Sequence, residues 1–271
     1  MDLQLSDMFG SSPKTIMEDR TVERPYGQVT YQIERFHEYL EQVLQLEAVA
    51  CKDWLTNKVD RSVTGRVAKQ QCTGPIQLPL NDVAVAALDY RGTKGIATAI
   101  GHAPVAGLIS AENGSVLAIA ESLTNLVWAP IKDGLKGVSL SANWMWPARN
   151  EGEDSRLYRA VKALSDFAIK LGINIPTGKD SLSMTQKYPD GKKVLAPGTV
   201  IISAMGECSD LKNTVSPFLA LEYNASIIYI DFSKDEYCLG GSSFAQLINK
   251  LGSKTPTVKD SAYFVKAFNA L

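Results

Sequence analysis

Two polar side chains, Glu121 and Asn125, stand four residues apart in the stretch SVLAIAESLTNLVWAPI, residues 115–131. The apolar residues of this stretch recur at the spacing of a helix with one strongly apolar face. Glu121 is the only charged residue in this stretch, whereas a solvated helix face normally carries several charges. Residues four apart lie one above the other on a helix, so a carboxylate and a carboxamide point the same way. They either hydrogen-bond inside a core or hold a ligand between them.

A third oxygen donor, Asp82, opens the apolar run DVAVAAL at residues 82–88. Three oxygen donors near one point suit a hard divalent cation such as Mg²⁺, which takes few protein ligands and completes its shell with water and phosphate oxygens. The sequence pattern alone does not bring Asp82 to the helix. Hydrogen bonds between these two side chains and loop backbone are therefore an open alternative, because short motifs often match by chance.

Two further segments combine residue types that could carry chemistry. TGKDSLSM (177–184) places glycine beside Lys179 and two hydroxyls, as in a phosphate-cradling loop, but it lacks the GxxxxGK[ST] spacing of a P-loop. A plain turn with a solvated lysine is the alternative. In SANWMW (141–146), Asn143 stands among aromatic residues, and core packing is the expected role of Trp144 and Trp146.

Composition narrows the class of protein. The 271 residues are 45% hydrophobic and 21% charged with a net charge of −1, which is typical of one large or two smaller globular domains. A charge near zero gives no reason to expect nucleic acid or an anionic membrane as a partner. No apolar run approaches the roughly 18 residues of a membrane span, and the N-terminal residues MDLQLSDMFGSSPK lack the pattern of a secretory signal.

Cysteine and histidine usage excludes several kinds of site. The four cysteines lie far apart without a CxxC pair, which favours free thiols in a reducing cytoplasm over a zinc site. Two histidines and no GxSxG motif argue against a hydrolase triad. These residues are Cys51, Cys72, Cys208, Cys238, His37 and His102.

Hydrophobic periodicity predicts alternating strands and helices. We expect an amphipathic helix within residues 30–56 and a helix over 154–172, with Asp154 or Ser155 as its N-cap and Gly172 just beyond its end. The run 82–88 is typical of a strand buried on both faces. Other strands are expected at 95–101, 137–146, 198–208 and 227–232, followed by a Gly-Gly turn at 240–241 and a helix from about Ser243. The chain still reads as helix at Leu271, which suggests a piece of a longer polypeptide, although a terminal helix would look the same.

The chain resembles the second synthetase half of the large, glutamine-dependent phosphoribosylformylglycinamidine synthases. The resemblance spans roughly residues 42–271. Five segments carry it, in order and at plausible spacing: DRSVTG (60–65), QQCTGPIQLPLNDVAVAAL (70–88), AESLTNLVWA (120–129), LSANWMWPARNEGED (140–154) and GKDSLSM (178–184).

The resemblance implies a carbon–nitrogen ligase of purine biosynthesis. Members of this family use ATP to activate the amide oxygen of formylglycinamide ribonucleotide, and ammonia derived from glutamine then displaces phosphate to give the amidine. The implied fold is mixed α/β: an aminoimidazole-ribonucleotide-synthetase-like N-terminal domain with a half-barrel sheet, then the start of a C-terminal α/β domain. Residues 1–59 would be a linker and helical lead-in, 60–215 the second N-terminal-type domain, and 216–271 the truncated C-terminal-type domain.

The resemblance also assigns ligands to residues. The magnesium ligands of this half fall on Asp82, Glu121 and Asn125, while Lys52, Asn81 and Asp82 fall at the nucleotide, which is ATP or ADP. In large members of the family this nucleotide is thought to be structural. No residue of the chain is therefore expected to be catalytic.

Several parts of the family are absent from this chain. A further acidic ligand and a nucleotide-contacting serine belong to a later segment, and the glutaminase domain and the first synthetase half are missing too. These domains of the same polypeptide are the expected partners, and without them the chain is expected to be inactive and to form a homodimer through its uncovered half-barrel. The alternatives are another synthetase or kinase of the same fold superfamily, such as thiamine-monophosphate kinase or selenophosphate synthetase, and a non-catalytic assembly domain.

Overall fold

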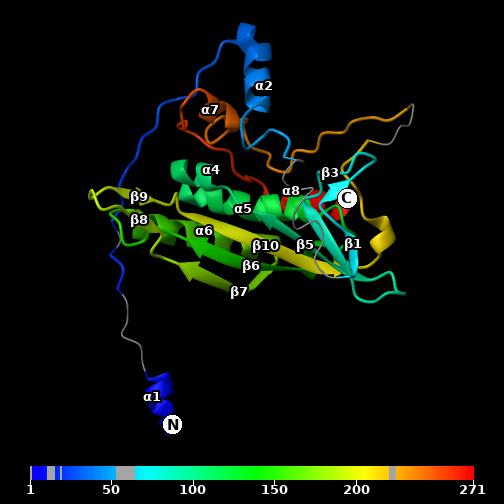
Figure 1. The fold of residues 1–271 in the computed structure, drawn as a ribbon, viewed down its shortest axis with the longest axis horizontal. Helices are drawn as coiled ribbons and strands as arrows, with labels where there is room; N and C mark the ends of the chain where they lie inside the picture. The colour runs from blue at the N-terminus through cyan, green and yellow to red at the C-terminus, as the bar shows by residue number, and fades with distance from the viewer. Residues whose placement is uncertain (1, 11–15, 19, 53–64, 220–223) are drawn as a thin grey trace.

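A six-stranded mixed sheet forms the centre of the molecule (Figure 1). The computed structural model describes residues 2–10, 16–18, 20–52, 65–219 and 224–271. All neighbouring strands in the sheet are antiparallel except β6 and β7, which are parallel. In spatial order the strands are β1 (Val67–Lys69), β4 (Val83–Ala87), β5 (Gly95–Gly101), β10 (Thr199–Cys208), β6 (Val138–Met145) and β7 (Asn174–Ser181).

Two small hairpins and several helices surround this sheet. The hairpins pair β2 (Cys72–Thr73) with β3 (Leu78–Pro79), and β8 (Thr185–Lys187) with β9 (Lys193–Leu195). No helix in the described part of the chain is long and apolar enough to cross a membrane. The helices are α1 (Leu5–Phe9), η1 (Ile33–Arg35), α2 (Phe36–Leu44), α4 (Pro104–Ile109), α5 (Ala111–Leu126), η2 (Gly134–Gly137), α6 (Glu153–Leu171), η3 (Leu211–Asn213), α7 (Ser243–Leu247) and α8 (Ser261–Ala270).

Helices α5 and α6 cover one face of the sheet and bury the main core against it (Figure 1). Helix α8 packs on α6 and brings Phe264 and Phe268 into the same core. At Gly101, an added Cβ would lie 2.3 Å from the backbone of Ala118 in α5. Only glycine allows so close an approach, so α5 lies directly on the end of β5.

The described helices cover one face of the sheet and leave the other open, which corrects the expectation of a doubly buried strand at 82–88. In β4, Val83 and Val85 are buried, whereas Ala84 and Ala86 between them are exposed. An antiparallel sheet needs only one packed face, and residues alternate between the two faces along each strand. The same alternation leaves Ile100 on the open face.

Helix α6 begins one residue earlier than expected. It starts at Glu153, and Gly152 occupies the N-cap position with φ +78°. The expectation of Asp154 or Ser155 as N-cap was wrong, because both lie within the first turn. Gly172 ends the helix in the left-handed conformation (φ +72°), as predicted.

The C-terminal residues depart furthest from the expected pattern. Residues 227–232 form no strand, and Ile227 and Ile228 are 88% and 79% exposed. A strand needs a neighbour that accepts its backbone hydrogen bonds, and none of the described segments pairs with this one. The predicted turn is present at Gly241 (φ +75°), and α7 begins at Ser243 as expected.

Candidate functional site

Helix α5 carries Glu121 and Asn125 over the end of β5. The backbone N–H of His102 donates a hydrogen bond to Oε2 of Glu121 at 2.5 Å, and Nδ2 of Asn125 donates to the carbonyl oxygen of Ile100 at 3.0 Å. Both side chains thus bind the chain where it leaves the sheet. These are the backbone hydrogen bonds that the sequence left open as an alternative.

The same hydrogen bonds leave two oxygens for another ligand. Within the part of the chain that the structure describes, neither Oε1 of Glu121 nor Oδ1 of Asn125 accepts a hydrogen bond. Asp82 directly precedes β4, and the pairing of Val83 with Ala99 puts Asp82 beside Ile100. Strand pairing therefore brings Asp82 to the segment that both α5 side chains hold.

A cavity of about 360 Å³ lies at this point. Asp82 and Asn125 both line it, whereas Glu121 lines a neighbouring depression together with His102. The structure thus brings two of the three expected donors into one cavity and places the third one helical turn away. The cavity is lined by Leu80, Asn81, Asp82, Val83, Asn125, Trp128 and residues 215–219.

The donor set fits a hard cation. Carboxylate and carboxamide oxygens are the ligands that Mg²⁺ accepts. Among the described residues no three His, Cys, Asp or Glu side chains gather at a point, so a metal here would need the amide oxygen of Asn125 as well as Asp82 and Glu121. The chemistry of these three groups is compatible with Mg²⁺ bound to nucleotide phosphates.

The two other nucleotide residues lie in different settings. Asn81 borders the cavity; its Nδ2 donates to the Gln70 carbonyl at 2.6 Å, and its Oδ1 is buried with no partner among the described residues. Lys52 donates to the carbonyl of Ala50 at 3.0 Å. The described residues that line the cavity do not include Lys52.

Lys69, at the end of β1, was missed by the sequence analysis. Its side chain is buried, and its Nζ donates to the carbonyl oxygen of Val215 and to Oγ of Ser216, the latter at 2.9 Å. Burial lowers the pKa of the Lys69 ammonium from its usual value. A lysine that follows an alanine and precedes two glutamines gave no signal of this role, because its partners lie about 146 residues away.

Most of the TGKDSLSM segment forms neither a phosphate-binding loop nor a plain turn. Residues 177–181 belong to β7, an edge strand paired with β6, and Lys179 donates to Ser181. An extended strand cannot wrap its backbone N–H groups around one anion. The core role expected for Trp146 is confirmed, since it is 1% exposed.

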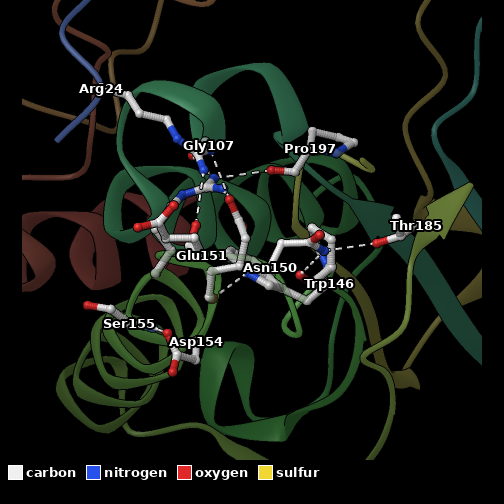
Figure 2. Close-up of polar contacts among 12 residues, drawn as sticks. Arg24, Gly107, Trp146, Asn150, Glu151, Asp154, Ser155, Thr185 and Pro197 are labelled. Atoms are coloured by element: carbon white, nitrogen blue, oxygen red, sulfur yellow. Dashed lines mark hydrogen bonds and ion pairs between the residues drawn. The ribbon is translucent and has the colours of Figure 1, made fainter. Parts of the chain in front are cut away.

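A buried ion-pair network holds the start of α6 (Figure 2). The two carboxylate oxygens of Glu153 accept from Arg156 at 2.6 Å and from Arg24 at 2.8 Å. Arg156 also donates to the carbonyl oxygens of Gly107 and Pro197 and lies 5.2 Å from the centre of the Trp146 ring. The network joins five segments of the chain, which gives it a structural role.

Comparisons with known proteins agree with the resemblance seen in the sequence. A family profile described as the FGAR-AT PurM_N-like domain matches residues 51–207. A probable phosphoribosylformylglycinamidine synthase, chloroplastic/mitochondrial, of Arabidopsis thaliana is 40% identical over 280 residues, which cover 100% of this chain and 19% of that protein. The phosphoribosylformylglycinamidine synthase of Homo sapiens is 44% identical over 234 residues, which cover 86% of this chain and 17% of the human protein.

The chain therefore spans about a fifth of the length of these curated relatives. Among solved structures, PurLQS from Thermotoga maritima aligns with a TM-score of 0.48 at 15% identity, covering 76% of this chain and 29% of that one.

Proposed function

Because the chain belongs to the family of FGAR-AT PurM_N-like domains, we propose that it is the nucleotide-holding part of a phosphoribosylformylglycinamidine synthase. The parent protein would convert formylglycinamide ribonucleotide, glutamine and ATP into the amidine. The curated relatives are named for this activity. The remaining domains of the same polypeptide, a first synthetase half and a glutaminase, would supply the turnover site and the ammonia. Residues 1–59 would be the linker and helical lead-in. Residues 60–215 would form the N-terminal-type domain, and residues 216–271 would begin the C-terminal-type domain.

Within this chain, Asp82, Glu121 and Asn125 would hold Mg²⁺ against the phosphates of ATP or ADP. One observation carries this part of the proposal: Asp82 and Asn125 line a single cavity. Glu121 stands one helical turn from Asn125 and is tied to the same exit of β5. Bound Mg²⁺ would neutralise the two carboxylates and the phosphate charge. Asn81 and Lys52 would contact the nucleotide.

We place the parent protein in the cytoplasm. Cys51, Cys208 and Cys238 are free thiols, and free thiols persist where glutathione and thioredoxin keep them reduced. The name of the Arabidopsis relative refers to chloroplasts and mitochondria, which are also compartments with reducing interiors.

The metal proposal is tested by two substitutions on opposite sides of α5. Glu121→Gln keeps the size and the hydrogen bond to His102 but removes the charge, so it should abolish Mg-ADP binding and cost the fold little. Leu123 is fully buried, and Leu123→Ala should lower the free energy of unfolding by about 2–5 kcal/mol and leave nucleotide affinity largely intact in the folded fraction.

Calorimetric titration with Mg-ADP and thermal melts of both variants separate the possibilities. Glu121→Gln could instead unfold much of the protein and leave nucleotide binding intact in the folded fraction. In that case Glu121 and Asn125 serve only to hydrogen-bond the backbone. The chain would then be a non-catalytic assembly domain, a role that the hydrogen bonds to His102 and Ile100 also suit.

A further inference from the structure

Residues 215–219 form one wall of the cavity that contains Asp82 and Asn125. The side chains of this wall are poorly buried: Val215 is 54%, Phe218 49% and Leu219 79% exposed. Apolar burial therefore contributes little to holding the wall in place. Its position must depend on a small number of specific contacts.

Among the described residues, three contacts connect the wall to other segments. The N–H of Val215 donates to the carbonyl oxygen of Trp128 at 2.8 Å. The Phe218 side chain lies against the backbone at Gly74, where an added Cβ would approach it to 3.5 Å. The third contact is the Lys69 ammonium, which binds the Val215 carbonyl oxygen and the Ser216 hydroxyl.

Lys69 contacts the wall through Val215 and Ser216 and can therefore influence the shape of the cavity. Its exposed fraction is 7%, and the acceptors that it has among the described residues are two neutral oxygens. A buried ammonium that lost the wall would have to find new acceptors or become hydrated, so the contact favours the closed wall. The backbone carbonyl of the next residue, Gln70, accepts a hydrogen bond from Asn81, which lines the same cavity.

We propose that Lys69 is a positioning residue that fixes residues 215–219 as a movable wall of the nucleotide cavity. Lys69 touches no ligand in this role; it acts through the Val215 carbonyl and the Ser216 hydroxyl. The part of the inference that concerns nucleotide rests on the proposed function, whereas the part that concerns the wall does not. Loss of the ammonium would let the wall open and would shorten the residence of a bound nucleotide.

The test compares Lys69→Met, which keeps the length of the side chain and removes its charge, with Lys69→Arg, which keeps the charge. Lys136→Met is the matched control, because Lys136 is exposed and does not line the cavity. Amide hydrogen exchange of residues 215–219 and of the β5 and β10 core is measured on the full 271-residue chain. Stopped-flow release of Mg-ADP is measured in parallel.

We expect Lys69→Met to speed exchange at 215–219 by about tenfold or more, the effect of losing one charge-assisted hydrogen bond. Exchange in β5 and β10 should stay unchanged, Mg-ADP release should quicken by a similar factor, and Lys69→Arg should restore both. Unchanged exchange at 215–219, or an equal acceleration in the core strands, would overturn the proposal that Lys69 holds the wall. Faster exchange with normal Mg-ADP release would overturn its link to the nucleotide. If the unmutated chain binds no Mg-ADP, the nucleotide proposal fails. The exchange measurements still decide whether Lys69 holds residues 215–219 in place.

Discussion

Replacement of Glu153 by alanine should destabilise the fold strongly. The Glu153 side chain is 1% exposed and pairs with Arg156, whose side chain is 8% exposed. Glu153→Ala leaves the Arg156 guanidinium buried, with only the neutral carbonyls of Gly107 and Pro197 as acceptors. Removal of one partner from a buried ion pair costs about 3–5 kcal/mol. For a domain of this size, that loss lowers the melting temperature by roughly 6–20 °C.

The size of this loss can be checked against an exposed ion pair on the same helix. Lys162 and Asp166 are joined at 2.6 Å, yet their side chains are 60% and 49% exposed. Solvent screens such a pair, so Asp166→Ala should leave the melting temperature unchanged within error. Calorimetry and urea titration of both variants measure the difference.

A third variant separates charge from shape. Glu153→Gln keeps one acceptor for Arg156 but removes the negative charge, so its loss of stability should fall between those of the two alanine variants. Equal melting temperatures for Glu153→Ala and Asp166→Ala would refute the reasoning, since burial would then make no difference to the value of an ion pair.

Three further outcomes are expected. On the open sheet face, the side chains of Ile96, Ile100 and Met205 are 42%, 56% and 51% exposed. The chain should therefore be dimeric by light scattering at micromolar concentration. Met205→Lys should yield monomers, and a monomeric unmutated chain would contradict this prediction. Burial raises the pKa of Asp235, but hydrogen bonds from Lys259 and from two backbone N–H groups lower it more, so that it lies below 3.8. The resulting stability is present above pH 3.8 and is lost as the pH falls through the lowered value; melts at decreasing pH should show a shallower loss for Asp235→Asn, and parallel curves would exclude this role. The chain alone should form no amidine from formylglycinamide ribonucleotide with glutamine or ammonium, since it spans 17–19% of its relatives; release of ADP dependent on both substrates would disprove it.

Local pattern was sufficient to predict several of the longer regular elements. The apolar spacing predicted α5 and α6, and the small or β-branched runs predicted β5 and β10, because each of these elements buries one continuous apolar face. Gly172 predicted the end of α6, because a left-handed residue there suits glycine. These features depend on a residue and its immediate neighbours.

Errors arose where the answer depended on a distant segment. Residues 227–232 have strand composition but no pairing partner among the described residues. Residues 177–181 have the composition of a loop but pair with β6. Helix α6 has its N-cap at Gly152, directly before the buried Glu153, whose partner Arg24 lies 129 residues away.

The candidate site divides in the same way. The sequence by itself determined that Glu121 and Asn125 share one side of a helix, since helical geometry places residues four apart together. Only the tertiary structure decided that Asp82 meets Asn125 in a cavity, that Glu121 lies just outside it, and that Lys69 holds its wall. Strand pairing and close helix packing create these contacts between residues 43 to 146 positions apart, and no local pattern encodes a partner at such a distance.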